Sequence, residues 1–328
     1  MKRLVRAIAA GSQDDLDRLA RKVVETERRS GHTRLADELE SIMLQKRRPK
    51  NGLNHTKDPV LRELPVSRRG SEILVTAIPS QSLEHHMVLA PEVEERFSRI
   101  EREYAARERL LAFGLRPRKT ILLYGPPGCG KSLGAKRLAW NTGLPLMKVK
   151  FDALISSYFG ESASNLRAIF ESAKERPCVL LLDECDFIAR SRMNSRDIGE
   201  ASRIVNSLLQ LMEEYDAPGL LVATTNIESS LDSALFRRFD EVFHVPLPSQ
   251  HEIRNLLQWT LSAVKVSPKL DWDELSRELM GESAAEVCKV AHNAAKAAVL
   301  SGHKSVSAED LQRAISELQD FKKQDNSE

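Results

Sequence analysis

The feature that most constrains this chain is a short segment of glycine, proline and small polar residues between two regular patterns. It follows the apolar run Ile121–Tyr124 and precedes a stretch with helical spacing. Such a segment predicts a phosphate-binding loop, because glycines let successive backbone N–H groups surround phosphate oxygens at a helix N-terminus. The segment consists of Gly125, Pro126, Pro127, Gly128, Cys129, Gly130, Lys131 and Ser132.

Two side chains of this loop have predicted roles toward a nucleotide. Lys131 is expected to reach the β- and γ-phosphates, and the hydroxyl of Ser132 is expected to bind Mg²⁺. Leu133, the first residue after the loop, completes the predicted ATP-binding segment. The sequence therefore predicts ATP and Mg²⁺ as cofactors.

A second apolar run, Val179–Leu182, ends in two acidic residues. Asp183, at the carboxyl end of this predicted strand, suits the coordination shell of Mg²⁺. Glu184 is expected to polarise the attacking water as a general base. An acidic strand end is common by itself, so this interpretation depends on the phosphate-binding loop that precedes it.

The predicted fold is α/β, because short apolar runs alternate with helical segments, as in a parallel sheet covered on both faces. After Pro246 and Pro248 only helical patterns follow, and Ser283 and Ser307 are expected to cap two of these helices. The expected strands are Ile121–Tyr124, Leu146–Val149, Val179–Leu182, Leu220–Ala223 and Val242–Val245. The expected helices are 92–111, 250–264, 271–279, 284–300 and 307–319.

These patterns divide the chain into four parts. Residues 1–46 are predicted to form a helical N-terminal unit, because their apolar residues recur at helical spacing. Residues 47–70 are polar and contain several prolines, which predicts a linker. Residues 71–247 are the predicted α/β nucleotide-binding domain with a parallel five-stranded sheet, and residues 248–328 are a predicted all-helical lid domain.

The two motifs, in this order and context, resemble the Walker A and Walker B motifs of the AAA ATPase family. The resemblance covers about Phe113 to Ala298. It implies a P-loop ATPase fold and an ATP phosphohydrolase. Residues Leu220–Asn226 are similar to the family's fourth strand with its sensor asparagine, so Asn226 would orient water alongside Glu184.

Residues Leu231–Asp240 are similar to the family segment that delivers arginine fingers to a neighbouring subunit. The resemblance makes Arg237 and Arg238 the fingers, and together with Val245–Pro248 this pair is most similar to the katanin and spastin group. A finger from the next subunit can be worth about 10³–10⁵ in rate. The resemblance thus implies a homo-oligomeric ring, in the family a hexamer.

Residues Ser156–Ser162 resemble the family's central-pore loop, with Tyr158 and Phe159 before Gly-Glu-Ser. In a ring these two rings would grip an extended polypeptide substrate. The alternative is a buried aromatic pair, but adjacent side chains point in different directions and the neighbours are polar, which favours a surface loop. The segment Arg190–Arg196 is either a second, basic pore loop or a solvated loop.

The segment Gly281–Glu286 is similar to the stretch that opens the lid helix in the family and touches the nucleotide base. Ser283 and Ala284 are therefore predicted ATP contacts. The chain departs from the family pattern here, because Ala284 stands where glycine is usual and Glu286 stands where aspartate is usual.

The family's adenine-binding segment upstream of the loop is not evident in residues 85–112. In this region only the stretch Phe113–Pro117 is similar to the family. This similarity adds Gly114 to the predicted ATP-binding residues.

Composition and charge narrow the class of protein. The chain has 328 residues, of which 41% are hydrophobic, and a net charge of only +2. A run of about 18 apolar residues, as a membrane span needs, does not occur, and no secretory signal pattern is found, so a cytoplasmic protein is expected. The four cysteines form no Cys-x-x-Cys pair, which predicts reduced thiols rather than disulfides or a metal site.

The favoured hypothesis is a ring ATPase that threads, unfolds or disassembles proteins, with a separate protease or adaptor bound to the N-terminal unit. No protease motif of the His-Glu-x-x-His or Gly-x-Ser-x-Gly type occurs in the chain. The alternative is an AAA+ ATPase that acts on nucleic-acid complexes. Residues 1–70 favour it with seventeen Lys and Arg against ten Asp and Glu, but no DNA-reading module is recognised. A switch that binds ATP without hydrolysing it is a third class, which the presence of Glu184, Asn226 and Arg237 opposes.

Overall fold

The computed structural model describes residues 65, 73–79, 82–151, 162–185, 200–226 and 237–325. The N-terminal unit 1–46, nearly all of the linker 47–70, the pair Tyr158 and Phe159, and the segment Arg190–Arg196 lie outside the described residues. The chain divides into two compact units, residues 1–56 with 262–265 and residues 57–261 with 266–328. The strands and helices below belong to the second unit.

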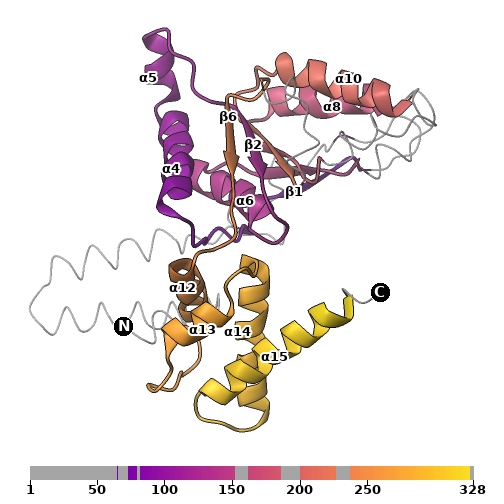
Figure 1. Ribbon diagram of the computed structural model, residues 1–328. Coiled ribbons are helices and arrows are strands. Elements are labelled where there is room, and N and C mark those ends of the chain that lie inside the picture. Colours follow the sequence, from indigo (N-terminus) through magenta and orange to yellow (C-terminus); the bar gives the residue numbers. More distant parts are fainter. Residues whose placement is uncertain are drawn as a thin grey trace, which may run out of the picture. The chain divides into compact units, whose positions relative to one another are not determined.

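A six-stranded sheet forms the centre of the α/β domain (Figure 1). Its order is β1-β3-β4-β5-β2-β6, and each neighbouring pair is parallel except β1 with β3. The α/β fold predicted from the sequence is confirmed, and each of the five predicted strands agrees to within two residues. The strands are β1 (Val75–Ile78), β2 (Thr120–Tyr124), β3 (Leu146–Val149), β4 (Val179–Leu182), β5 (Leu220–Thr225) and β6 (Glu241–His244).

The predicted number of five strands was wrong by one. The additional strand, β1, pairs antiparallel with β3 at the edge of the sheet, with Val75 opposite Val149. Its four residues begin five positions after the end of the predicted linker at residue 70. A run this short gives no periodicity of its own, and an antiparallel edge strand is common on an otherwise parallel sheet.

The predicted helices are present, but the segment 92–111 forms two helices, separated at Ala106. The helix predicted over 250–264 ends at Thr260, and the helix predicted over 307–319 continues to Asp325. The helices of the α/β domain are α4 (Pro91–Ala105), α5 (Arg107–Ala112), α6 (Lys131–Thr142), α8 (Ser162–Glu175) and α10 (Glu200–Glu213). Those of the C-terminal part are α12 (Gln250–Thr260), α13 (Trp272–Glu278), α14 (Ala284–Leu300) and α15 (Ala308–Asp325).

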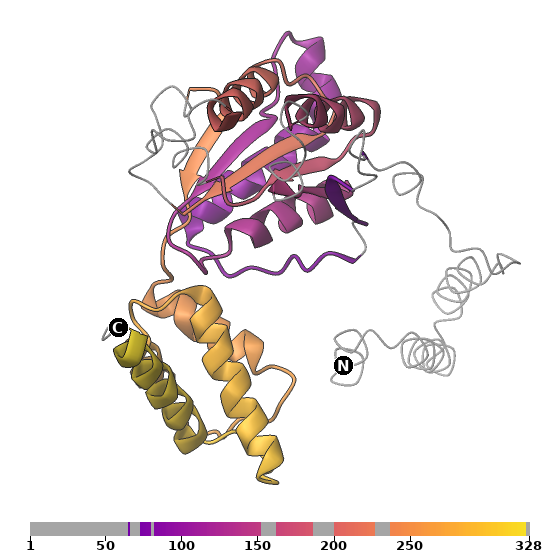
Figure 2. The same cartoon turned by 90° about the vertical axis from the view of Figure 1, so that its right-hand side faces the viewer.

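Both faces of the sheet are buried, because side chains alternate along each strand. In β4, Val179 and Leu181 pack in one core cluster with residues of α4 and α6, whereas Leu180 and Leu182 pack in another with residues of α8 and α10. Figures 1 and 2 show the same layers, with α4 and α6 on one face of the sheet and α8 and α10 on the other.

The two predicted serine caps are confirmed in the C-terminal helices. The N–H group of Ser283 donates to the Glu286 carboxylate at 2.9 Å, and the N–H group of Glu286 donates to Ser283 Oγ at 3.3 Å. Ser307 and Asp310 form the same reciprocal arrangement at 2.9 and 3.2 Å. Such capping boxes satisfy donors that have no partner within the helix, and α14 is thereby fixed at its first residue.

The cysteines are unpaired thiols, as the sequence predicts, and Cys129, Cys178 and Cys185 are buried. Burial raises the pKa of the Cys178 thiol to about 12, so it stays protonated. Over the described ranges, we find neither a group of metal-binding side chains of the His, Cys, Asp and Glu kind nor a helix with the length and apolar character of a membrane span.

Candidate active site

The strand order brings the predicted catalytic residues together. Strand β5 lies between β2 and β4, so the carboxyl ends of these three parallel strands are neighbours. The phosphate-binding loop follows β2, Asp183 and Glu184 follow β4, and Asn226 follows β5. Groups from three separate parts of the sequence thus meet at one end of the sheet, where α/β proteins commonly bind ligands.

The loop after β2 has a backbone path that two of its glycines make possible. Gly125 has φ 139°, and a Cβ there would lie 2.3 Å from the carbonyl oxygen of Val245. Gly128 has φ 73°, and a Cβ there would lie 2.6 Å from the hydroxyl oxygen of Ser283. The loop is therefore packed closely on β6 on one side and on the start of α14 on the other.

Lys131 is buried at the first position of α6. Its ammonium donates hydrogen bonds to the carbonyl oxygens of Gly125 at 2.8 Å and Pro126 at 2.7 Å. The side chain thus lies folded over the loop rather than pointing into solvent. Phosphate oxygens are stronger acceptors than these carbonyls, so the ammonium can exchange its partners when a nucleotide enters.

Ser132 and Asp183 meet in the geometry expected for a shared cation. Ser132 Oγ donates to Asp183 Oδ1 at 2.7 Å, and the hydroxyl of Thr224 donates to the same oxygen at 2.7 Å. The second carboxylate oxygen, Oδ2, lies 2.6 Å from Lys148 Nζ. A hydroxyl and a carboxylate side by side are the oxygen ligands that Mg²⁺ prefers, so these residues fit the metal that the family implies.

Asp183 is ionised in this arrangement although it is 9% exposed. Burial by itself raises the pKa of this carboxyl group, but the hydrogen bonds from Lys148, Ser132 and Thr224 outweigh burial and hold the pKa below its usual value. The site therefore offers a fixed negative charge to a cation.

Glu184 adopts a left-handed backbone conformation with φ 57°. Among the described residues it is the one residue other than glycine with a positive φ. Its N–H group donates to Thr224 Oγ1 at 2.9 Å, and the N–H group of Cys185 donates to the Thr224 carbonyl at 2.8 Å. These bonds hold a turn that leaves the Glu184 side chain exposed at the end of the sheet. Strain of this kind at a strand end is a marker of a functional residue.

Thr224 is a residue of this site that the sequence analysis missed, since it orders both Asp183 and Glu184. Its signal was present in the sequence, because β5 ends in the polar residues Thr224 and Thr225 after a fully apolar run. Asn226 lies half-buried directly after them, at the position expected for a residue that orients water.

The two predicted arginine fingers differ in environment. Arg238 Nη1 donates to the Leu209 carbonyl at 2.8 Å and to the Glu213 carboxylate at 2.8 Å, so it is fixed on α10. Arg237 is exposed and has no partner within the part of the chain that the structure describes. Only Arg237 therefore has the freedom that a finger needs in this arrangement.

Both arginines precede β6, which runs parallel to β2. They thus lie at the amino-terminal end of the sheet, whereas the phosphate-binding loop follows the carboxyl end of β2. The five residues of β2 span roughly 16 Å. Arg237 consequently lies on the wrong side of its own domain to reach a nucleotide bound there.

The start of α14, which contains the predicted ATP contacts Ser283 and Ala284, packs on the phosphate-binding loop. The N–H group of Ala285 donates to the Gly128 carbonyl at 3.0 Å, and Ser283 is the residue that a side chain at Gly128 would strike. Two alanines thus allow a close approach of helix and loop, which explains how the site tolerates Ala284 in place of glycine.

Gly114 is not brought to this site. It follows α5 with φ 72°, and a Cβ there would meet no atom within 4 Å. Because Gly114 precedes β2, it lies toward the amino-terminal end of the sheet, opposite the loop. Its physical role in the structure is to end a helix, and the contact of Gly114 with ATP stays a prediction.

A different segment upstream of α4 lies beside the loop. The methyl group of Met87 is 3.2 Å from the position of a Cβ on Gly130, and His86 stacks on Trp259 of α12 with ring centroids 4.4 Å apart. Burial, together with the charges of His85 and Arg137, lowers the pKa of His86, so its imidazole is neutral at pH 7. The sequence analysis found no signal here, because an irregular segment with no glycine motif shows no pattern.

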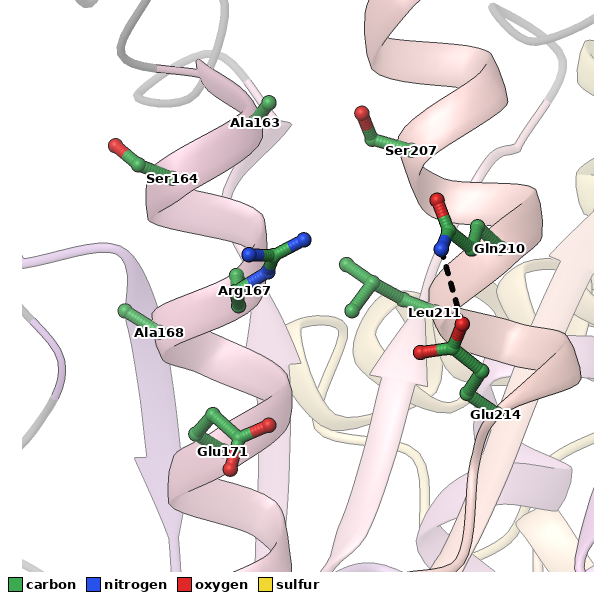
Figure 3. A pocket seen from close by; sticks show the side chains of 9 residues that line it. All are labelled: Ala163, Ser164, Arg167, Ala168, Glu171, Ser207, Gln210, Leu211 and Glu214. Atoms are coloured by element: carbon green, nitrogen blue, oxygen red, sulfur yellow. Dashed lines mark hydrogen bonds between the residues drawn. The ribbon is translucent and has the colours of Figure 1, made fainter.

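A groove of about 570 Å³ lies elsewhere, between α8 and α10 (Figure 3). Arg167 and Glu171 line it from α8, and Gln210 and Glu214 line it from α10, where Gln210 donates to Glu214 at 2.9 Å. Since these helices cover the face of the sheet opposite to α6, the groove is separate from the phosphate-binding loop.

The fold and this site define a P-loop nucleotide-binding domain. Residues 121–247 match the family model described as "ATPase family associated with various cellular activities (AAA)". This match covers most of the α/β domain and supports the predicted resemblance to the AAA ATPases over these residues.

Three relatives are similar in sequence to this chain. The chain is 42% identical over 214 residues to an uncharacterized AAA family ATPase, y4kL, of Sinorhizobium fredii, covering 65% of this chain and 64% of the relative. It is 34% identical over 208 residues to the ATP-dependent zinc metalloprotease FtsH of Parabacteroides distasonis, covering 61% and 30%. It is 31% identical over 276 residues to the proteasome-activating nucleotidase of Methanothermobacter thermautotrophicus, covering 82% and 65%. The chain spans less than two thirds of the length of each of these relatives.

Proposed function

We propose that this chain is a Mg²⁺-dependent ATPase that works as a homo-oligomeric ring, a hexamer, to remodel, unfold or disassemble protein substrates. The observation that carries the proposal is the network of Ser132, Asp183, Thr224 and Glu184 at the carboxyl end of the sheet. It joins a cation site to an exposed carboxylate beside a phosphate-binding loop, which is what hydrolysis of a nucleoside triphosphate requires.

The residues of the proposed active site have different roles. Lys131 binds the β- and γ-phosphates, and Ser132 and Asp183 hold the metal. The metal, when bound, neutralises charge that develops on the phosphate oxygens. Glu184 accepts a proton from the attacking water, and Asn226 orients that water.

The placement of Arg237 supports the proposed ring. An arginine that lies at the opposite end of the sheet from its own phosphate-binding loop can act only on a nucleotide bound by another copy. Arg238, fixed to α10 by Leu209 and Glu213, then supports the segment that carries Arg237 rather than reaching the phosphates itself. This assignment narrows the predicted pair of fingers to one.

The substrate class rests on the relatives and on the predicted pore loop. Two relatives are named as a metalloprotease and as a nucleotidase that activates proteasomes, and both functions concern polypeptides. Tyr158 and Phe159 are then the residues that grip an extended polypeptide in the pore. A separate protease or adaptor acts with the N-terminal unit. The cytoplasmic location and the similarity to the katanin and spastin subgroup stay predictions.

The competing function is an ATPase that acts on nucleic-acid complexes, for which the basic residues 1–70 are the one favourable feature. A trapped form separates the two classes. Glu184→Gln protein with ATP should bind a fluorescent, permanently unfolded protein such as casein, and it should bind single-stranded DNA or RNA of similar size much more weakly. The control is Glu184→Gln protein that also carries Tyr158→Ala and Phe159→Ala, which should bind ATP but not casein. Preferential capture of the oligonucleotide would overturn the protein-remodelling proposal.

A further inference from the structure

Lys148 stands at an unusual position for a charged residue. It interrupts the apolar strand β3, whose other three residues are buried, and its side chain is 48% exposed. In the sheet it is paired with Leu181 of β4. A lysine in the interior of a central strand calls for a local partner, because an uncompensated charge at such a position is costly.

The partner is Asp183, and the alternation of the strands brings the two together. Leu146, Val179 and Leu181 belong to one core cluster on the α6 face of the sheet. Lys148 lies two residues after Leu146, and Asp183 lies two residues after Leu181. Because side chains alternate along a strand, both point to that same face. The Lys148 ammonium reaches Asp183 Oδ2 at 2.6 Å.

The two oxygens of Asp183 thus have different partners. Oδ1 accepts hydrogen bonds from two neutral hydroxyl groups, those of Ser132 and Thr224, at 2.7 Å each. Oδ2 faces a cation. Lys148 therefore places a positive charge on the carboxylate that the proposed function assigns to Mg²⁺, and its exposed stem leaves room for the ammonium to move away.

We propose that Lys148 is a built-in substitute for the metal cation: it neutralises Asp183 when no Mg²⁺ is bound and so reduces the dependence of nucleotide binding on Mg²⁺. Without any cation, the charge of Asp183 repels the phosphates of an entering nucleotide. With Mg²⁺ present, the ammonium gives up its place, because two cations beside one carboxylate repel each other. Lys148 acts through Asp183 and is a positioning residue.

The test is a thermodynamic cycle that measures the affinity for ADP, which is not hydrolysed, with Mg²⁺ and with EDTA. In Lys148→Met protein the affinity in EDTA should fall about three- to tenfold, the scale of one partly exposed charge pair, while the affinity with Mg²⁺ is unchanged or higher. The ratio of the two affinities should therefore rise by at least that factor. Lys148→Arg should keep the ratio of the parent protein.

Lys150→Met is the matched control, because Lys150 is an exposed lysine two residues further on. This substitution removes the same charge without touching Asp183. The ratio of the ADP affinities with Mg²⁺ and with EDTA should therefore equal that of the parent protein. If Lys148→Met is poorly folded, Lys148→Gln provides a second neutral side chain for the same measurement. A purely structural lysine would weaken ADP binding equally in both conditions.

The proposal rests on the Mg²⁺ site of the proposed function, and the two fail in different ways. If Mg²⁺ tightens ADP binding by the parent protein, but the ratio is the same in Lys148→Met protein, or changes equally in Lys150→Met protein, the role of Lys148 is refuted and the metal site stands. If Mg²⁺ has no effect on ADP binding either by the parent protein or by Lys148→Met protein, the metal site itself is refuted.

Discussion

The two ends of the central sheet use charged residues in opposite ways. At the amino-terminal end, Asp240 accepts hydrogen bonds from the N–H groups of Lys119 and Thr120 and from the Thr120 hydroxyl, at 2.8 to 2.9 Å. Arg238 is bound to Glu213 and to a backbone carbonyl. These partners tie loops to neighbouring strands and helices, and no ligand needs to displace them.

At the carboxyl end the partners are exchangeable. Lys131 donates to carbonyls of its own loop, and Asp183 faces an ammonium that can move into solvent. The comparison teaches that charge alone does not mark the site in this domain. The proposed functional groups at this end are those whose present partners a nucleotide or a cation can replace. Arg237, at the other end, is the proposed exception, because it would act on a nucleotide bound by a second subunit.

Lys131→Ala should have the largest effect, the loss of ATP binding, because it removes the charge placed on the β- and γ-phosphates. Titration calorimetry with ATP measures this directly. The matched control is Lys136→Ala, which removes a lysine from the same helix α6 beyond the loop and should leave the affinity unchanged. Equal ATP affinity of Lys131→Ala and parent protein would contradict the site.

Arg237→Ala and Arg238→Ala should separate a finger from a structural arginine. Arg237→Ala should reduce ATP turnover by about 10³-fold while ATP affinity and melting temperature stay the same. Arg238→Ala should lower the free energy of unfolding by about 1 kcal/mol, since it loses a partly exposed ion pair and a hydrogen bond, with a smaller loss of turnover. Steady-state turnover and chemical denaturation of both proteins measure these effects. If Arg238→Ala instead lost turnover and Arg237→Ala lost stability, the contrast between the two ends of the sheet would be wrong.

Glu184→Gln should reduce turnover by about 10²-fold or more and leave ATP binding intact, because the amide keeps the shape of the side chain but cannot accept a proton. A single-turnover assay with bound ATP separates the chemical step from binding. Hydrolysis at the parental rate would show that another group is the base.

Glu286→Gln should have the smallest effect, through the start of α14. Hydrogen bonds from Lys322 and Ser283 outweigh the opposing effect of burial and lower the pKa of Glu286 to about 2. A lowered folded-state pKa stabilises the fold above the ordinary value near 4.5, and this stabilisation is lost as pH falls toward 2. The variant should be less stable than the parent by under about 1 kcal/mol at pH 7 for this partly exposed group, and the difference should shrink below pH 4.5. An equal difference at pH 7 and pH 3 would assign the effect to packing instead.

Much of this domain could be predicted because its signals are local. The phosphate-binding loop, the acidic pair after β4 and the serine caps each depend on residues adjacent in sequence. The roles of Thr224 and Lys148 depend on which strands are neighbours, and the order β3-β4-β5-β2 is not encoded in any single segment.

The predictions that the topology does not support have the same origin. Gly114 was assigned to the nucleotide from a nearby familiar stretch, but the length of β2 separates it from the loop. Arg237 and Arg238 look equivalent in sequence, and only the position of Glu213 on α10 distinguishes them. Local chemistry is thus visible in the sequence, whereas the end of the sheet on which a residue lies is a property of the topology.

The central claim, that each complete active site combines the carboxyl end of one sheet with Arg237 from another copy, is tested most directly by mixing. Lys131→Ala and Arg237→Ala proteins should each be nearly inactive. Their mixture should recover ATP turnover with a maximum at intermediate proportions, because an Arg237→Ala subunit then receives the finger of a Lys131→Ala neighbour. A double variant with both substitutions, mixed with Arg237→Ala protein, should restore nothing. If the turnover of the first mixture equals the weighted sum of its components at every proportion, in preparations shown by light scattering to form mixed oligomers, the claim is contradicted.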